Sequence, residues 1–336
     1  MKITPYIQGL ITKAQKLGKT IVLPEGEDER VLQAAHTAAE QKIAQIIILG
    51  NETDIKNYFA GQGWDFAGIE IIDPAKSPKL GEYAKMLFEL RKSKGMTEEE
   101  AANAALNANY FGTLMIKAGD ADGMVSGANH STADTVRPAL QIIKSRRPER
   151  VVSALFIMES KDGKIYYLSD CAVNINPTAR EMADIALSSA ESVLQFGDEP
   201  RIAMLSYSTF GSGKGEGVDK VREATALAKE GLKDAEYAGQ PIKLDGEMQA
   251  DAALDEIVAK KKAPASDVAG HANVLIFPNI ESGNIGCKLL QRLGGAELYG
   301  PMLQGLNAPV NDLSRGCSAA DIVGLIAITV LQTQKQ

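Results

Sequence analysis

Cysteine is scarce in this chain, whose 336 residues include only Cys171, Cys287 and Cys317. The three cysteines are far apart, and no CxxC or cysteine–histidine spacing typical of a zinc site accompanies them. Their odd number and wide spacing also argue against a framework of disulfides. This pattern predicts a protein of a reducing compartment.

Aromatic residues are few as well, at 5% with Trp64 as the single tryptophan, so we expect a mostly aliphatic core. The longest apolar run, residues 322–331, is about half the length that a membrane span requires. The first residues lack the apolar segment and the cleavage site of a secretory signal. Together these absences predict a cytoplasmic protein.

Positive charge is in deficit, because 36 Lys and Arg face 43 Asp and Glu, for a formal net charge of −7. This balance argues against non-specific binding to nucleic acid or to an anionic membrane. The net charge does not exclude a polyanionic small molecule as the substrate, but a few local cationic or backbone N–H groups must then form its site. The length suggests two domains of roughly 150 residues each.

The first half of the chain alternates short apolar runs with amphipathic stretches. The runs are continuous, as expected of strands buried on both faces, and they predict a parallel sheet covered by helices. We expect strands at residues 20–23, 44–49, 69–72 and 121–125, and helices that begin at Thr4-Pro5, at Asp28 and at the capping box of Thr97 and Glu100.

The second half contains more strand. Residues 151–158 and 164–168 predict a β-hairpin with Asp162-Gly163 in its turn. Further expected elements are a long helix from Pro177 to about Gln195, strands at 202–205 and 274–277, and a helix from Ser318 onward. The fold class is therefore α/β. A cleft between two domains is the default place for a binding site.

The most glycine-dense segment, residues 210–217, follows the strand expected at 202–205. It is not a Walker A motif, because Gly215 follows Lys214, and it is not GxGxxG, because residue 216 is Glu. A phosphate-binding loop and a flexible surface loop both remain open. Residues 282–286 resemble a second, weaker anion-binding helix start, and the isolated histidines are expected to be structural (His36, His130 and His271).

Two further segments could carry chemistry. Residues 122–132 lead from a strand into a helix, are dense in hydroxyl groups and are followed by Arg137. Residues 309–323 bring a hydroxyl, a guanidinium and a carboxylate together just before an apolar helix. Each has a plain structural interpretation, a hydroxyl-rich helix cap in the first and a Ser318–Asp321 capping box in the second.

At these residues the chain resembles the phosphate acetyl/butyryl transferase family, and the resemblance is collinear from end to end. It rests on long motifs in the same order: LPEGEDER (23–30), GDADGMVSGANHSTADTVRPALQ (119–141), DCAVNINP (170–177), AMLSYSTFGS (203–212), DGEMQADAA (245–253), IFPNIESGNIG (276–286) and PVNDLSRGCSAADIV (309–323). One departure is Cys287, where the family usually has tyrosine.

The resemblance implies reversible transfer of an acetyl group between acetyl phosphate and coenzyme A, without a metal, a resident cofactor or a covalent intermediate. It also implies two α/β domains of the isocitrate/isopropylmalate dehydrogenase-like type, with the active site in the cleft between them, in a homodimer. We expect residues 1–148 and 304–336 to form the first domain. Residues 149–303 would then form the second, as cleft wall and dimer interface.

The family motif also assigns roles. Asp321 is expected to act as the base for the CoA thiol, Ser314 to hydrogen-bond the sulfur or the carbonyl, and Arg315 to bind acetyl phosphate. Arg91 and Arg137 are expected to hold phosphate groups, and Ser131 and Thr135 to line the phosphate pocket.

Three alternatives stay open at this point. The same reaction with a longer acyl chain would make the protein a phosphate butyryltransferase. A non-catalytic acyl-CoA-sensing module of the same fold is a second alternative, although the chain keeps Ser314, Arg315 and Asp321. A dehydrogenase of the same fold is the third, and the sequence shows no pattern of aspartates that would bind its metal.

Overall fold

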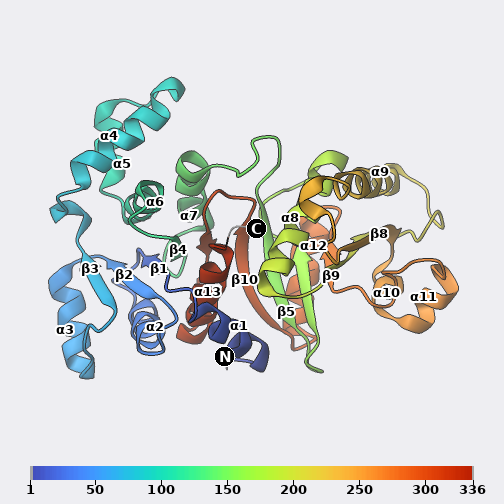
Figure 1. The fold of residues 1–336 in the computed structure, drawn as a ribbon, viewed down its shortest axis with the longest axis horizontal. Coiled ribbons are helices and arrows are strands. Elements are labelled where there is room, and N and C mark those ends of the chain that lie inside the picture. Colours follow the sequence, from blue (N-terminus) through green and yellow to red (C-terminus); the bar gives the residue numbers. More distant parts are fainter. Residues whose placement is uncertain (1–2, 335–336) are drawn as a thin grey trace. The chain divides into compact units, whose positions relative to one another are not determined.

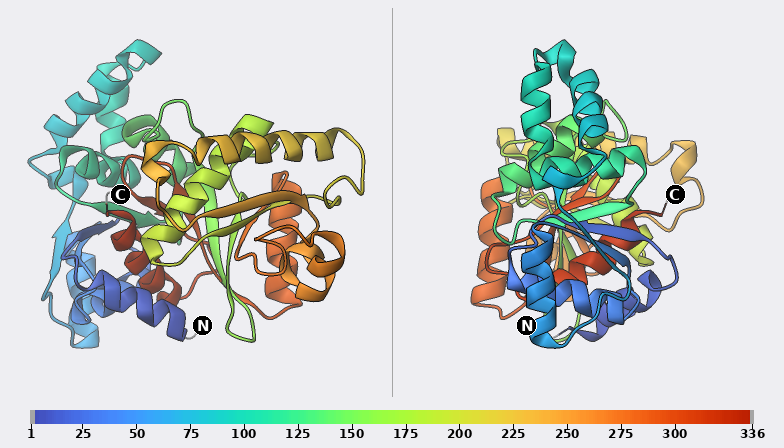
Figure 2. Two further views of the ribbon diagram at one scale, coloured as in Figure 1. Left: turned by 45° about the vertical axis from the view of Figure 1, so that its right-hand side comes forward. Right: turned by 90° about the vertical axis from the view of Figure 1, so that its left-hand side faces the viewer.

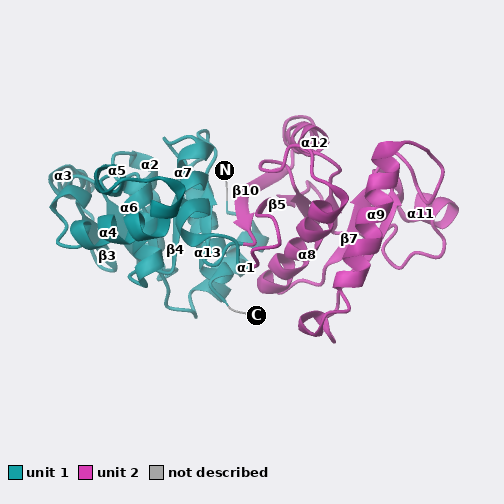
Figure 3. Ribbon diagram, turned by 90° about the horizontal axis from the view of Figure 1, so that it is seen from above, with its two compact units in different colours: residues 1–146, 306–335 teal, residues 147–305, 336 magenta. Residues whose placement is uncertain are grey.

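In the computed structural model, which describes residues 3–334, the chain divides into two compact units. The first unit holds the described residues up to 146 and from 306 onward, and the second holds residues 147–305 (Figure 3). Each unit has its own sheet and its own helices (Figure 1). The chain therefore leaves the first unit and returns to it for one more strand and its last helix.

The first unit contains a five-stranded sheet in the order β11-β4-β1-β2-β3, and every neighbouring pair in it is parallel. The parallel sheet predicted from the continuous apolar runs is confirmed. Its strands are β1 (Thr20–Leu23), β2 (Gln45–Leu49), β3 (Ile69–Ile72), β4 (Gly123–Ser126) and β11 (Val310–Asp312).

Helices lie on both faces of this sheet (Figure 2). They are α1 (Pro5–Ala14), α2 (Glu29–Glu40), α3 (Glu52–Gln62), α4 (Leu80–Arg91), α5 (Glu98–Ala105), α6 (Ala108–Ala118), α7 (Thr132–Pro138), which continues as a π-helical turn (Ala139–Ile143), and α13 (Ala319–Gln332). Local capping starts many of them as the sequence predicted: Thr4 caps α1, Asp28 caps α2, and Thr97 with Glu100 forms the capping box of α5.

The apolar C-terminal run forms the centre of the first unit. It lies in α13, which packs against α1, α2 and the strands β1, β4 and β11. Because neighbours cover this helix all round, residues 322–331 are all buried. No helix among the described residues is long and apolar enough to cross a membrane.

The second unit contains a six-stranded mixed sheet in the order β10-β5-β6-β9-β7-β8. The predicted hairpin is confirmed as the antiparallel pair β5 (Ser153–Glu159) and β6 (Ile165–Ser169), and β10 (Glu297–Gln304) adds to it antiparallel. The other strands, β7 (Arg201–Leu205), β8 (Lys243–Met248) and β9 (Val274–Ile276), are parallel to their neighbours. The α/β class holds for both units.

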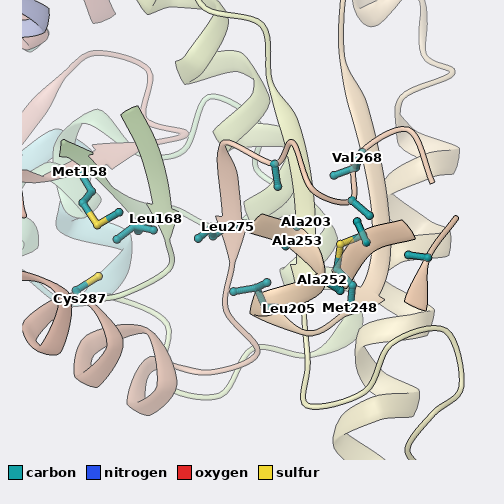
Figure 4. Close-up of a cluster of buried hydrophobic side chains, with 14 of the residues drawn as sticks. Met158, Leu168, Ala203, Leu205, Met248, Ala252, Ala253, Val268, Leu275 and Cys287 are labelled. Carbon is teal, nitrogen blue, oxygen red and sulfur yellow. The ribbon is translucent and has the colours of Figure 1, made fainter. Parts of the chain in front are cut away.

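The helices of the second unit are α8 (Ala179–Phe196), α9 (Glu216–Gly231), α10 (Ala250–Leu254), α11 (Glu256–Lys262) and α12 (Ile280–Arg292). One part of its core is a cluster of small and aliphatic side chains from the strands β5 to β9, the helices α10, α11 and α12 and the loops between them (Figure 4). Cys287 of α12 lies at one end of that cluster (Figure 4). As the shortage of aromatic residues predicted, the cluster is mostly aliphatic.

Candidate active site

The candidate site lies at one edge of the sheet of the first unit. β11, β4 and β1 are neighbours and parallel, so their carboxyl ends meet at the same edge. The loops that leave them are residues 24–28, 127–131 and 313–318. Such an edge is where open α/β sheets bind ligands. All of the predicted site residues belong to this unit, and most of them follow β4 or β11.

A buried carboxylate, Glu25, holds the loop that follows β4. Its Oε2 accepts hydrogen bonds from the backbone N–H groups of Gly127 at 3.0 Å and Ala128 at 2.9 Å. Its Oε1 accepts from the N–H groups of Asn129 and His130, both at 2.8 Å. Four backbone donors on one carboxylate fix the path of residues 127–130.

The side chain of His130 completes this arrangement, with Nδ1 2.8 Å from Glu25 Oε1. Burial opposes the charge of Glu25, but the hydrogen bonds from His130 and from the backbone outweigh it and keep the pKa of Glu25 below its usual value. The same contact raises the pKa of His130. The structural role expected for His130 is therefore the role that its contacts support.

The guanidinium of Arg30, in the first turn of α2, connects all three loops. Its Nη2 donates to Asp28 Oδ2 at 2.6 Å and to the carbonyl oxygen of Ala128 at 2.9 Å. Its Nη1 donates to the carbonyl oxygens of Arg315 at 2.8 Å and Cys317 at 3.0 Å. Arg30 thus sets the position of the segment that carries Ser314 and Arg315.

Ser314 and Arg315 themselves are exposed. Ser314 Oγ accepts a long hydrogen bond of 3.4 Å from the N–H of Gly316. The next side chain, Cys317, is buried, and burial raises the pKa of its thiol to about 11. Cys317 is therefore protonated and unreactive at neutral pH, whereas the hydroxyl and the guanidinium before it are available to a ligand.

Asp321 forms the capping box predicted for α13. Its Oδ2 accepts from the N–H of Ser318 at 2.8 Å and from Ser318 Oγ at 2.9 Å. Its Oδ1 is buried and has no hydrogen-bond partner among the described residues. The capping box therefore uses one carboxylate oxygen and leaves Oδ1 without a hydrogen bond.

The other predicted residues lie on or near α7. Ser131 is the N-cap of that helix and forms a capping box with Asp134. Thr135 is fully buried, and its Oγ1 has no hydrogen-bond partner among the described residues. Thr135 lies close enough to Asp312, the last residue of β11, for its hydroxyl to lower the pKa of that carboxyl group.

Arg91 and Arg137 are 46 positions apart in sequence and lie near the same tyrosine. Burial raises the pKa of Tyr110, and the charges of Arg137 and Arg91 oppose that rise, so both guanidinium groups lie within electrostatic range of this phenol. Arg137 is exposed, and Arg91 Nε is buried without a hydrogen-bond partner among the described residues. Within residues 3–334, no hydrogen bond joins either arginine to Asp321.

Sequence reasoning gave no role to Glu25, Arg30 or Asp312. The first two belong to the LPEGEDER motif and the third to PVNDLSRG, so the motifs marked the segments but not the function of each side chain. Asp312 is 1% exposed, and burial raises its pKa to about 6. No group of three or more His, Cys, Asp or Glu side chains within residues 3–334 could hold a metal ion.

The glycine-dense segment of the second unit is tied down by another buried carboxylate. Glu247 Oε1 accepts from the N–H of Gly211 at 2.9 Å and from Ser208 Oγ at 2.8 Å, and Oε2 accepts from Arg222 Nε at 2.9 Å. The loop leads into α9, whose N-cap residue is Gly215, so no side chain caps the start of this helix.

One expectation in the second unit is wrong. Residues 282–286 do not start a helix, because they lie inside α12, which already begins at Ile280. The side chain of Asn279 caps it by accepting a hydrogen bond from the N–H of Ser282. Asparagine is a favoured N-cap residue, so the helix begins directly after Asn279, earlier than we expected.

Cys287, where the family usually has tyrosine, is buried, with its Sγ 3.2 Å from Cys171 Sγ. Both are free thiols. The contact with Cys287, together with burial, raises the pKa of Cys171. This position therefore contributes packing to the core of the second unit and presents no polar group to solvent.

Comparison with known proteins shows the family of this chain. The family model described as "Phosphate acetyl/butaryl transferase" matches residues 6–330. A phosphate acetyltransferase of Thermoanaerobacterium thermosaccharolyticum is 50% identical over 98% of this chain and 99% of its own length. A phosphotransacetylase structure from Streptococcus pyogenes superposes with a TM-score of 0.91 at 46% identity, covering 99% of both chains. A phosphotransacetylase from Staphylococcus aureus gives 0.90 at 46% identity over 98% of both chains.

Proposed function

We propose that this chain, which belongs to the phosphate acetyl/butyryl transferase family, catalyses the reversible reaction of acetyl-CoA with phosphate to give CoA and acetyl phosphate. It is an acyltransferase. The observation that carries the mechanism is the unpartnered Oδ1 of Asp321, seven residues after an exposed hydroxyl, Ser314, and six after an exposed guanidinium, Arg315. A base, a hydrogen-bond donor and a cation are what attack of a thiol on an acyl phosphate requires.

In the direction of acetyl-CoA synthesis, the CoA sulfur attacks the acetyl carbon while Asp321 Oδ1 takes the thiol proton. A free thiol near pKa 8.5 and a free aspartate near pKa 3.9 differ by about 4.6 units, or roughly 6 kcal/mol. Complete proton transfer before attack is therefore unfavourable. Deprotonation concerted with formation of the C–S bond avoids a free thiolate.

Electrostatics and positioning supply the rest of the rate. Arg315 binds acetyl phosphate and polarises its carbonyl, and Ser314 hydrogen-bonds the sulfur or the carbonyl oxygen. The C–O bond to phosphate then breaks and the phosphate group leaves with the electron pair. The hydrogen bonds from Arg30 to the carbonyl oxygens of Arg315 and Cys317 support this proposal, because they hold the backbone from which these groups project.

Arg91 and Arg137 bind the phosphate groups of CoA or of acetyl phosphate, and Ser131 and Thr135 line the phosphate pocket. The common influence of the two arginines on Tyr110 supports a joint role. A chain with a net charge of −7 has to concentrate cations locally to attract polyanions. Lys and Arg are the groups that phosphate contacts favour.

An assay of CoA-dependent acetyl phosphate consumption, with release of orthophosphate, tests the proposal. We expect turnover in the presence of EDTA, because the mechanism uses no metal. Loss of activity with EDTA and its recovery with Mg²⁺ or Zn²⁺ would contradict the metal-free mechanism. Faster turnover of butyryl than of acetyl phosphate would identify a butyryltransferase, and acyl-CoA binding without turnover would identify a sensing module.

We also infer that the protein is a cytoplasmic homodimer that uses the second unit as its interface. Three residues spaced by four, Ile285, Leu289 and Leu293, lie at or next to α12 and are 57%, 51% and 80% exposed. They form an apolar face, which a second copy of this chain would cover in a twofold dimer. The free thiols fit a reducing compartment.

Sedimentation of the wild type and of Leu293→Glu tests the dimer. We expect the wild type to sediment as a dimer and the variant as a monomer. Leu254→Glu is the matched control, because Leu254 is 40% exposed on α10 of the same unit. A wild-type monomer, or a Leu293→Glu dimer as tight as the control, would contradict this interface.

A further inference from the structure

Asp312 is a buried carboxyl group for which the mechanism above has no use. It ends β11, where it pairs in register with Ser126 of β4, and it is 1% exposed. Its Oδ2 accepts a hydrogen bond from Thr132 Oγ1 at 2.7 Å. Its Oδ1 is buried and has no hydrogen-bond partner among the described residues. A buried carboxylate oxygen without a donor is costly, so its presence needs an explanation.

The surroundings of Oδ1 are tight on one side and polar on the other. Gly127, at φ +109°, has no side chain, and a Cβ there would lie only 2.4 Å from Oδ1. The backbone of the loop thus approaches the carboxyl group closely. Thr135, whose buried hydroxyl also lacks a partner among the described residues, is the polar neighbour. Asp312 Oδ1 and Thr135 Oγ1 are therefore two buried oxygens of neighbouring side chains, in the segments to which phosphate binding is assigned above.

We propose that Asp312 is a positioning residue for the acyl-phosphate site, and that it takes up a proton from solvent when a dianionic phosphate group binds. The proposal rests on the function proposed above, because it assumes an anion at Thr135 and Arg315. A protonated Oδ1 can donate to Thr135 Oγ1, and the hydroxyl hydrogen of Thr135 is then free to point to the ligand. The proton also removes a negative charge from beneath the dianion.

The state of Asp312 without ligand suits this role. Burial raises its pKa to about 6, the hydroxyls of Thr132 and Thr135 oppose the rise, and the negative charge of Glu25 adds to it. The titratable and charged groups on the elements and loops around β11 are Glu25 after β1, Arg30 on α2, His130 after β4, Asp134 and Arg137 on α7, Arg315 and Cys317 after β11, and Asp321 on α13. A dianion adds negative charge, so it raises the pKa of Asp312 further in the complex.

The affinity for a dianion therefore depends on pH. Below pH 6 Asp312 already carries the proton, and the dianion binds with its full affinity. As the pH rises through 6, binding has to take up the proton, and the affinity falls until the pH passes the pKa of the complex. Each unit by which the ligand raises that pKa corresponds to a tenfold loss of affinity.

Sulfate is the probe, because it is a tetrahedral dianion that does not titrate between pH 5.5 and pH 8. We expect its inhibition constant against acetyl phosphate to rise about tenfold over this range in the wild type, for a shift of about one unit. In Asp312→Asn, where the amide oxygen can still accept from Thr132, the constant should stay within about twofold of the wild-type value at pH 5.5. kcat should change less than the inhibition constant.

Two further variants separate Asp312 from its neighbours. His130 also loses positive charge as the pH rises, so His130→Asn must keep the wild-type slope if Asp312 is responsible. Thr132→Val removes a hydrogen bond that lowers the pKa of Asp312, so the midpoint of the slope should move to higher pH. This variant keeps the test available if Asp312→Asn does not fold.

Calorimetry of sulfate binding in buffers of different ionisation enthalpy measures the proton directly. Near pH 6.5 the wild type should take up a fraction of a proton per sulfate, and Asp312→Asn should take up none. A flat wild-type profile, an unchanged slope in Asp312→Asn, or a slope lost in His130→Asn would overturn the proposal. Absence of acetyl transfer in the wild type would refute the proposed function alone, because calorimetry does not depend on turnover.

Discussion

Each sheet has a buried carboxylate at its carboxyl edge, but the two edges differ in what surrounds that carboxylate. In the first unit Glu25 binds four backbone N–H groups and His130, and in the second unit Glu247 binds Gly211, Ser208 and Arg222. Both anchor a loop. Near Glu25, however, Asp321 and Asp312 each keep one buried oxygen without a partner among the described residues.

The comparison separates a scaffold from a reactive site. A carboxylate whose oxygens are all engaged with the protein can position a loop but has no capacity left for a ligand. Spare hydrogen-bonding capacity next to exposed polar groups is what chemistry needs. On this criterion we assign the proposed reaction to the edge of the first unit.

The largest effect is expected for Asp321→Asn. If Asp321 is the base, kcat should fall by about 10²-fold or more while CoA affinity stays near normal. Because asparagine can still accept a hydrogen bond at this capping position, stability should fall by at most about 1 kcal/mol. Melting temperature, CoA affinity and kcat of the one variant decide between the two roles.

A matched control for this variant exists in the second unit. Glu181 forms the same kind of capping box with Thr178 at the start of α8. Glu181→Gln should leave kcat unchanged. An Asp321→Asn enzyme that melts lower but turns over at the wild-type rate would return Asp321 to a purely structural role.

Substitutions of Glu25 and Glu247 test whether the two loop-anchoring carboxylates differ in their effect on turnover. Glu25→Gln places an amide NH2 group, which cannot accept a hydrogen bond, against backbone N–H donors. We therefore expect the free energy of unfolding to fall by about 2–3 kcal/mol. kcat should fall as well, because the loop carrying Ser131 shifts. Glu247→Gln should also destabilise the protein but should reduce kcat much less. If both variants lost the same fraction of kcat under conditions in which both are fully folded, the two sheet edges would not differ in function.

Arg137→Ala tests the binding role of the cation pair near Tyr110. We expect KM for CoA or acetyl phosphate to rise about tenfold, or about 1.4 kcal/mol, with a smaller change in kcat. Arg180→Ala, which removes an arginine paired with Asp184 in the second unit, is the control. A loss confined to kcat would show that Arg137 does not act in binding.

The ion pair of His130 and Glu25 predicts a pH-dependent contribution to stability. The pKa of His130 is raised in the folded protein, so its contribution is complete below the unfolded value near 6.5 and is lost as the pH rises through the folded value. The pKa of Glu25 is lowered, so its contribution is lost in acid, as the pH falls below about 4.5.

His130→Asn should therefore destabilise the protein most between about pH 5 and pH 6.5, by about 1 kcal/mol, and less at pH 9. Unfolding by urea at three pH values measures this window. A cost that is constant from pH 5 to pH 9 would mean that the His130 charge contributes nothing.

The smallest effect is expected for the cysteine pair of the second unit. Cys287→Ala removes a small buried side chain from a packed cluster and should cost about 1 kcal/mol of stability. kcat should not change, because the Cys287 thiol contacts Cys171 rather than solvent. Cys171→Ala should behave alike, and a tenfold loss of kcat in either variant would give the second unit a role in the reaction.

Much of the fold could be predicted from local pattern. The continuous apolar runs predicted the parallel sheet, Asp162-Gly163 predicted the hairpin, and Ser318 with Asp321 predicted the start of the last helix. Each of these signals depends on residues a few positions apart. Strand and helix boundaries differed by a few residues, as for α1, which ends at Ala14 rather than near Leu17.

The candidate site was only partly predictable for the same reason. The motif around residues 309–323 marked Ser314, Arg315 and Asp321 together because they are close in sequence. It did not show that one oxygen of Asp321 would remain without a partner. That depends on which donors the folded chain brings near, and no local pattern contains this information.

Three properties could be predicted from the sequence alone: the α/β class, the parallel sheet of the first half with strands buried on both faces and, through the long motifs, the family. Only the tertiary structure decided that Arg30, from the start of α2, would hold the backbone of Arg315, 285 positions later. It also decided that Asp312 would be buried beneath Gly127 with an oxygen left free. The physical reason is that capping and periodicity act within a few residues, whereas burial and pKa depend on every segment that packs around a group.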